Sequence, residues 1–145
     1  MKTMAHSKNL TAREARLWHA WLQISEAVTS RVARDVAEAS GLSAAEYAIL
    51  VRLLEIGDGR LRQRELAAAL NWDKSRISHQ LTRMQERNLV TRTKTTQDGS
   101  QVAITRLGRD ALERARPIHA QAVRRHLIER LTPEQAATIL NLAGA

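Results

Sequence analysis

Polar and basic side chains share one face of residues 74–87, a segment whose pattern predicts a helix. Ile77, Leu81 and Met84 recur at steps of four and three residues, so they form the apolar face. Hydroxyl, imidazole and cationic groups occupy the other side and match the donors and acceptors of bases in a DNA major groove. These groups belong to Lys74, Ser75, Arg76, Ser78, His79, Thr82 and Arg83. The alternative is an ordinary amphipathic helix with a solvated basic face.

Arg76 is the side chain best placed to read a base. It lies in the first turn of the predicted helix, and the N-terminal end of such a helix usually enters the groove. Arg83 lies seven residues further on and faces the same way. Arginine to guanine is the commonest specific contact in the major groove. We therefore predict base readout or close backbone contact by Arg76, with Ser75, Ser78 and His79 beside it.

The positive charge of the chain is concentrated around this helix. The formal net charge is +8, and residues 60–94 hold nine basic and three acidic side chains, whereas residues 1–59 hold seven of each. Such an excess in one third of the chain indicates a polyanionic partner. Five cations in this region suit phosphates, whose contacts position a protein on DNA without reading its sequence. They are Arg62, Arg64, Lys74, Arg92 and Lys94.

The elements that must position these residues follow from periodicity and capping signals. An apolar stripe predicts a long first helix that ends at Gly41, and a capping box at Ser43 starts a second helix. Asp73 can cap the basic helix, and Asp98-Gly99 predicts a turn between two short strands. The predicted helices cover residues 11–40, 43–57, 63–70, 73–87, 106–131 and 132–143, and the predicted strands cover residues 89–94 and 101–104.

Several short motifs in this order resemble the multiple-antibiotic-resistance regulator (MarR) family. They begin at Gly41-Leu42-Ser43 and end at Ile104-Thr105 with Gly108. Between them lie Tyr47-Ala48-Ile49-Leu50, Arg64-Glu65-Leu66-Ala67, Trp72-Asp73-Lys74-Ser75-Arg76-Ile77-Ser78, Leu81-Thr82-Arg83-Met84 and Asn88-Leu89-Val90. The flanking helices match in length and order, so the resemblance spans nearly the whole chain.

This resemblance implies a mainly α-helical fold with a small β-hairpin, in which long dimerisation helices flank a winged helix-turn-helix. Residues 1–145 would form a single domain, with residues 42–105 as the DNA-binding region and residues 11–40 and 106–145 as the dimerisation region. The implied function is a sequence-specific transcription regulator, a homodimeric repressor on a pseudo-palindromic operator in double-stranded DNA.

Two positions depart from the family pattern. Asn88 stands where the family usually has Gly, a mild change because Asn tolerates the left-handed conformation. The Asp-x-Arg that the family usually carries at the tip of its hairpin falls on Thr96 and Asp98. We therefore expect the hairpin to contribute through Arg92 and Lys94 at its base, and the helix to carry more of the specificity.

Many relatives release DNA when a small aromatic or phenolic effector binds. Trp18, Trp21 and Tyr47 are candidates to line such a pocket, although core or interface packing is the commoner role for each residue. His119 and His126 lie seven residues apart on one predicted helix face. Packing at a dimer interface explains them better than a metal site shared across a dimer.

The remaining composition argues against other classes of protein. No phosphate-binding glycine loop, nucleophile elbow or metalloenzyme pattern is present, so we expect neither an enzyme nor a cofactor or metal. The chain has no cysteine and no apolar run of membrane-spanning length, and we expect it in the cytoplasm. Two other functions stay open: a non-specific architectural DNA-binding protein, and a winged helix that binds protein.

Overall fold

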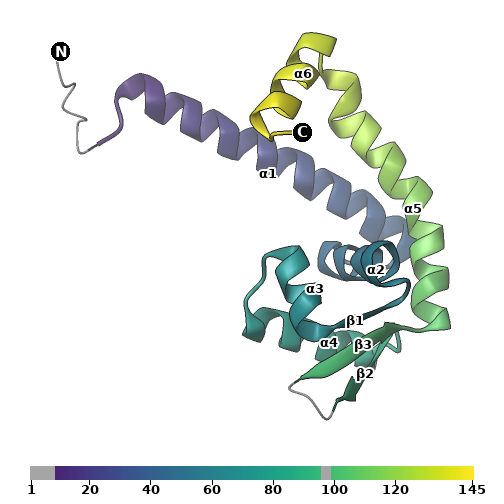
Figure 1. Cartoon of the computed structure of the whole chain (residues 1–145). Coiled ribbons are helices and arrows are strands. Elements are labelled where there is room, and N and C mark those ends of the chain that lie inside the picture. Colours follow the sequence, from purple (N-terminus) through teal and green to yellow (C-terminus); the bar gives the residue numbers. More distant parts are fainter. Residues whose placement is uncertain (1–8, 96–98) are drawn as a thin grey trace.

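The structure is a computed structural model that describes residues 9–95 and 99–145. Two layers are visible: a small module of short helices and a sheet, and long helices that extend away from it (Figure 1). The elements in chain order are α1 (Ala12–Ser40), α2 (Ala44–Gly57), β1 (Arg60–Arg62), α3 (Gln63–Leu70), α4 (Lys74–Glu86), β2 (Val90–Lys94), β3 (Ser100–Ile104), α5 (Arg106–His126), the 3-10 helix η1 (Ile128–Arg130) and α6 (Pro133–Leu142).

Local capping sets the ends of the helices, at boundaries close to those that the sequence predicts. Thr11 and Glu14 form a capping box that starts α1, and these hydrogen bonds hold the pKa of Glu14 below its usual value. Gly41 ends α1 in the left-handed conformation, with a φ of 75°. Further capping boxes at Ser43 and Thr132 start α2 and α6. These predicted boundaries are confirmed.

The predicted hairpin of β2 and β3 is confirmed, and the structure adds a third strand that the sequence did not reveal. The antiparallel sheet has the order β1-β3-β2, with Leu61 opposite Val102 and Val90 opposite Ile104. Strand β1 has only three residues, too few for a period of two to be recognised. Its central Leu61 is buried, so β1 anchors the sheet to the helices.

The core of the module lies between α2, α3, α4 and the inner face of the sheet. Ile77, Leu81 and Met84 are buried in it, which confirms the predicted apolar face of α4. Leu66 of α3 and Leu53 of α2 pack in the same cluster. Burial of one face leaves the other face of α4 directed outward.

The end of α4 and the start of α5 are joined closely. Asn88 adopts a φ of 57°, the left-handed conformation expected of it, and its carbonyl accepts a hydrogen bond from the Thr105 hydroxyl at 2.6 Å. A Cβ added to Gly108 would lie 2.2 Å from the Leu89 carbonyl oxygen, so only glycine permits this approach. Helix α5 is thereby fixed to the end of α4.

Helix α5 differs from the sequence prediction at its C-terminal end. The predicted helix continues to Leu131, but α5 ends at His126 and the 3-10 helix η1 follows. Pro117 lies inside α5, and the helix changes direction about halfway along its length (Figure 1). Among the described residues, no helix is long and apolar enough to cross a bilayer.

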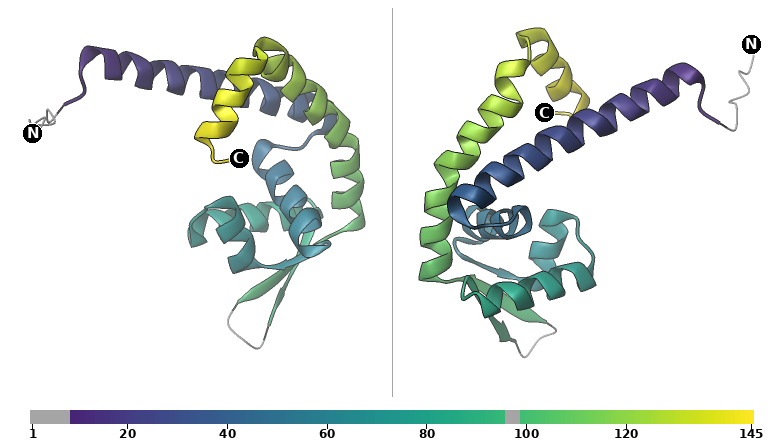
Figure 2. Two further views of the ribbon diagram at one scale, coloured as in Figure 1. Left: turned by 45° about the horizontal axis from the view of Figure 1, so that its top comes forward. Right: turned by 180° about the vertical axis from the view of Figure 1, so that it is seen from behind.

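The N-terminal half of α1 and the C-terminal helix α6 lie away from the module of short helices and sheet. Both views in Figure 2 show the N-terminal half of α1 projecting past everything else, and α6 folding back at the far end of α5. The contacts of α1 with other helices are chiefly with α5.

Candidate nucleic-acid interface

Helix α4 presents the predicted reading residues on the surface of the module. Asp73 caps the helix by accepting a hydrogen bond from the Arg76 backbone N–H at 2.8 Å, as predicted. Ser75, Arg76 and His79 are exposed and Ser78 is half-buried. The structure therefore places all four on the outward side of one helix.

Arg76 stacks on the aromatic ring of Trp72, which lies in the turn before α4. Its guanidinium carbon lies 3.9 Å from the ring centroid. Trp72 is half-buried against the core, so it provides a fixed base for the arginine. Such a contact is worth about 0.5–1 kcal/mol at an exposed site. It covers one face of the guanidinium and leaves the N–H groups at its edge available to a ligand.

Arg83 has a partner within the same helix. One of its terminal nitrogens donates to the Gln80 side-chain oxygen at 2.6 Å, and Gln80 is itself buried. The hydrogen bond to Gln80 restrains the direction of the Arg83 side chain. Arg83 is nevertheless exposed, so other donors of its guanidinium face solvent.

A groove beside α4 brings together some of the predicted phosphate-binding residues. It has a volume of about 730 Å³ and lies between α3, the start of α4 and the start of β3. Arg64 and Lys74 line it, along with Gln63, Gly99 and Ser100, which the sequence did not single out. Arg62 is exposed at the start of α3 and Lys94 is exposed at the end of β2, so both are also accessible.

Two of the nine cations in residues 60–94, Arg87 and Arg92, are held by acceptors of other elements of the same chain. Arg87 pairs with Glu46, with Nη1 2.6 Å from Oε1 and 2.5 Å from Oε2, and its Nη2 donates to the Gly41 carbonyl at 3.2 Å. The Glu46 side chain is only 6% exposed. Arg92 donates hydrogen bonds to the side chains of Gln85 and Thr82 on α4. The charge excess of this region therefore overstates the number of cations available to DNA.

The tip of the hairpin includes Thr96 and Asp98, which lie outside the described residues. The interpretation of this tip as lacking the usual arginine stays a sequence prediction. The predicted turn at Asp98-Gly99 falls partly in the same stretch.

A separate cavity lies between α1, α2 and α5. Its volume is about 320 Å³ and its lining is almost wholly apolar. The residues that line it are Val28, Thr29, Val32, Ala33, Val36, Ala44, Tyr47, Ala48, His119, Val123 and Leu127. Inside it the rings of Tyr47 and His119 stack, with centroids 4.5 Å apart and planes inclined by 17°.

Burial favours the uncharged form of both of these rings. Desolvation lowers the pKa of His119 and raises the pKa of Tyr47. For Tyr47 the nearby Arg116 acts in the opposite direction but is the smaller effect. The cavity thus combines apolar walls with the hydroxyl-bearing residues Thr29 and Tyr47 and the imidazole of His119.

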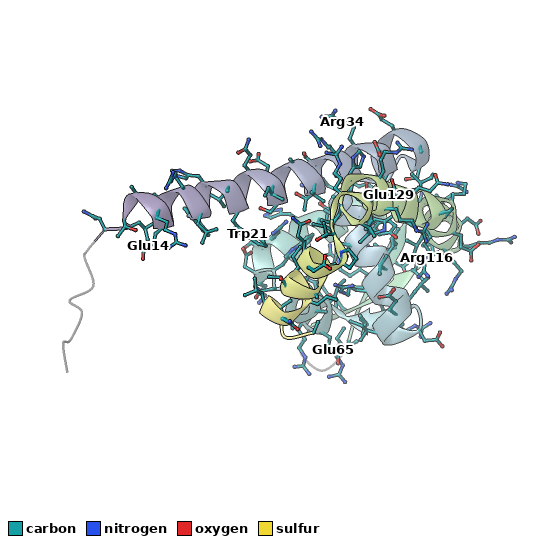
Figure 3. All side chains as sticks on the ribbon, turned by 90° about the horizontal axis from the view of Figure 1, so that it is seen from above. Glu14, Trp21, Arg34, Glu65, Arg116 and Glu129 are labelled. Carbon is teal, nitrogen blue, oxygen red and sulfur yellow. The ribbon has the colours of Figure 1, made fainter. Side chains whose placement is uncertain are left out.

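Only one of the three predicted pocket residues lines this cavity. Tyr47 lines it. Trp18 and Trp21 are 52% and 57% exposed and lie closer to the N-terminus of α1 than the residues that line the cavity. Figure 3 shows Trp21 on the projecting part of this helix, between Glu14 and the body of the molecule. The sequence shows which residues share a helix stripe, but not how much of a long helix the rest of the chain covers.

The two histidines of α5 contact residues of their own chain. His119 stacks on Tyr47, and His126 Nε2 lies 2.8 Å from Asp35 Oδ2. These contacts are with α2 and α1 of the same chain, and packing at a dimer interface stays a prediction for both histidines. Among the described residues there is no group of three or more metal-ligating side chains.

Solved structures resemble the chain over nearly its full length. AbsC, a MarR family transcriptional regulator from Streptomyces coelicolor, is 34% identical with a TM-score of 0.83, and the match covers 94% of this chain and 93% of AbsC. Sco3205, a MarR family transcriptional regulator from the same organism solved in complex with DNA, is 30% identical with a TM-score of 0.86, covering 94% and 87%.

A more distant structure shares the fold. The organohalide-sensing regulator RdhR-CbdbA1625, solved in its 2,4-dichlorophenol bound form, is 18% identical with a TM-score of 0.81, covering 99% of this chain and 86% of that one. A family model described as "Domain of unknown function (DUF7343)" matches residues 41–110, which span the module from the end of α1 to the start of α5. Comparison with curated proteins finds no significant match.

Proposed function

Because the chain belongs to the MarR family of transcriptional regulators, we propose that it is a homodimeric repressor that binds a pseudo-palindromic operator. The observation that carries this proposal is the outward face of α4, where Arg76 is held on Trp72 beside Ser75, Ser78 and His79. A helix with side chains fits the width of the major groove. Sco3205 was solved in complex with DNA, which supports DNA as the partner of this chain.

Different parts of the interface would have different roles. The start of α4 would enter the groove, where Arg76 reads a base. Arg64 and Lys74, which share the groove beside α4, would hold the adjacent phosphates, with Arg62, Arg83 and Lys94 around them. Serine and histidine among the cations favour sequence-specific recognition over an architectural role, because purely electrostatic binding needs only lysine and arginine.

The long helices would form the dimer. The apolar stripe of α1 is covered by its own chain at Val32 and Val36, but the same stripe is bare at Leu17, Trp21 and Ile24. Ile139, Leu140 and Leu142 of α6 are also exposed. A second copy related by a two-fold axis would bury both surfaces. Residues 11–40 and 106–145 would then be the dimerisation region and residues 42–105 the DNA-binding region.

The cavity between α1, α2 and α5 would hold an effector that releases DNA. Its apolar walls and neutral rings suit a small uncharged aromatic molecule, which Tyr47 and His119 could hydrogen-bond. The dichlorophenol complex of RdhR-CbdbA1625 shows that this fold can accommodate such a ligand.

Fluorescence anisotropy with DNA from upstream of the protein's own coding sequence tests the regulator proposal. A shuffled duplex of equal length serves as control, and both are measured at two salt concentrations. A specific regulator prefers one site by at least about 10³-fold. Equal affinity for both duplexes would favour the architectural alternative, and absence of binding to either would contradict both.

A further inference from the structure

The side chain of Arg92 connects the β2–β3 hairpin to α4, the helix proposed to enter the DNA groove, which we call the recognition helix. Its Nε donates to the Gln85 side-chain oxygen at 3.0 Å, and its Nη2 donates to the Thr82 hydroxyl at 2.9 Å. Longer contacts of 3.4–3.5 Å run from Nη1 to Gln63 at the start of α3 and to the carbonyl and hydroxyl oxygens of Ser78. One guanidinium therefore joins β2 to both helices of the helix-turn-helix.

The strand pattern explains why this arginine faces inward. Side chains alternate between the two faces of a strand, so Arg92 lies on the same face as Val90. Its register partner Val102 and the neighbouring Leu61 are both buried on that face. Arg92 thus occupies the inner side of the sheet, at the edge of the core where α4 passes over it.

The partners of Arg92 on α4 follow a single line along the helix. Ser78, Thr82 and Gln85 are spaced at i, i+4 and i+7, so they form one stripe. Thr82 also donates to the Ser78 carbonyl at 3.0 Å, which extends the network. This stripe borders the outward face, and contacts at two turns restrain rotation of α4 about its own axis.

We propose that Arg92 is a positioning residue for DNA recognition, which fixes the rotation of α4 relative to the hairpin rather than binding a phosphate. This inference rests on the proposed function. At least three of the five N–H donors of its guanidinium point at protein acceptors, so little of the group is left for DNA. The role depends on the planar fork of arginine and not on its charge alone.

Two variants distinguish positioning of α4 from binding of a phosphate: Arg92→Lys keeps the positive charge but loses the guanidinium, and Arg92→Gln loses both. If the fork positions α4, both variants lose about tenfold in affinity for the preferred DNA site, keep their affinity for shuffled DNA and keep the wild-type salt dependence. If Arg92 binds a phosphate, Arg92→Lys retains most affinity, and Arg92→Gln weakens binding to both DNAs equally. The slope of log K against log salt then falls by about 0.9 in Arg92→Gln. That result would overturn the proposal.

Lys74→Gln provides the matched reference, since Lys74 is exposed in the groove beside α4. Loss of the Lys74 charge should lower the slope of log K against log salt and weaken binding to both the preferred and the shuffled DNA. A double-mutant cycle with Gln85→Met tests the contact itself: if Gln85 acts through Arg92, the losses from Gln85→Met and Arg92→Lys do not add. Fully additive losses would count against the network.

Amide hydrogen exchange gives a readout that needs no DNA. Arg92→Lys should raise exchange along residues 78–86 and 90–94 together, without changing exchange in α1. Unchanged exchange in α4 would overturn the positioning role whatever the DNA result. A wild-type protein without DNA preference would instead contradict the proposed function while leaving this measurement intact.

Discussion

Three arginines close together in the sequence have different roles because their surroundings differ. Arg76 has one face on Trp72 and free donors at its edge. Arg87 is committed to the buried carboxylate of Glu46, and Arg92 to acceptors on α4. The stacked arrangement of Arg76 lowers the entropy lost on binding, since the ring already restricts the side chain.

Arg76→Ala should weaken binding to the preferred site by about 10- to 100-fold, because a bidentate contact to a base is worth about 1–3 kcal/mol. Binding to shuffled DNA should change little. Anisotropy titrations on both duplexes measure the two effects. Equal losses on the two would mean that Arg76 contacts only phosphates.

His119 should make stability depend on pH. Burial lowers its pKa below 6.5, so the unfolded chain takes up a proton at this residue before the folded protein does. This part of the stability is complete above pH 6.5 and falls as the pH drops towards the folded-state pKa. His119→Phe keeps a ring against Tyr47 and removes the titration.

Urea unfolding of wild type and His119→Phe between pH 8 and pH 5 measures this contribution. The difference between the two proteins should stay constant above pH 6.5 and change below it, with the variant losing less stability. Parallel curves across the whole range would rule out a titration coupled to folding at His119.

Pairs of elements distant in the sequence hold the DNA-binding module together. Glu46 at the start of α2 pairs with Arg87 at the end of α4, and Arg87 also reaches the Gly41 carbonyl at the end of α1. The side chain of Arg87 therefore joins the start of α2 and the end of α1 to the C-terminal end of α4.

Arg87→Met should destabilise the fold by about 2–4 kcal/mol, because it leaves the buried Glu46 carboxylate without its partner. Adding Glu46→Gln should recover part of the loss, since the amide oxygen can still accept the Ser43 N–H. The free energy of urea unfolding measures both. A double variant no more stable than Arg87→Met would show that the unpaired charge is not the cause.

Elements defined by short-range signals could be predicted from the sequence, and those defined by distant partners could not. The capping boxes at Thr11 and Ser43 act within four residues, so the starts of α1 and α2 were predictable. Strand β1 exists because Leu61 pairs with Val102, some forty residues away. The pairing of Arg87 depends on Glu46, an acceptor 41 residues away.

The same limit applies to the candidate site. Periodicity was enough to place Ser75, Arg76 and His79 on one exposed face. The position of Arg92, two residues after an apolar Val90 in a strand, was a signal for its inward direction, but its partner Gln63 is 29 residues away. The charge of Arg92 alone indicated a phosphate contact.

On the scale of the whole molecule, the chain leaves large apolar surfaces without cover. They lie on the projecting half of α1 and on α6, at a distance from the DNA-binding module (Figures 1 and 2). We expect light scattering at micromolar concentration to give about twice the 16.3 kDa of the chain. A monomer under these conditions would contradict the assignment of the dimerisation region.

Trp21→Glu should shift the protein towards monomer and weaken operator binding, because it places a charge in the proposed interface. Ile56→Glu is a matched control, since Ile56 is 58% exposed, close to the 57% of Trp21, but lies on α2. The control should remain a dimer. Light scattering over a dilution series compares the two, and equal dissociation of both variants would argue against a specific role of α1.

The close contact between Gly108 and Leu89 makes α5 a lever attached to the recognition helix. With 21 residues, α5 is about 30 Å long. Because α5 bends at Pro117, a rotation of about 10° about its C-terminal end would displace α4 by at most roughly 5 Å, which is still comparable to the 3.4 Å rise between bases along a DNA strand. A side chain at position 108 would loosen this joint, and in the proposed dimer the spacing of the two α4 helices would then no longer match the helical repeat of DNA.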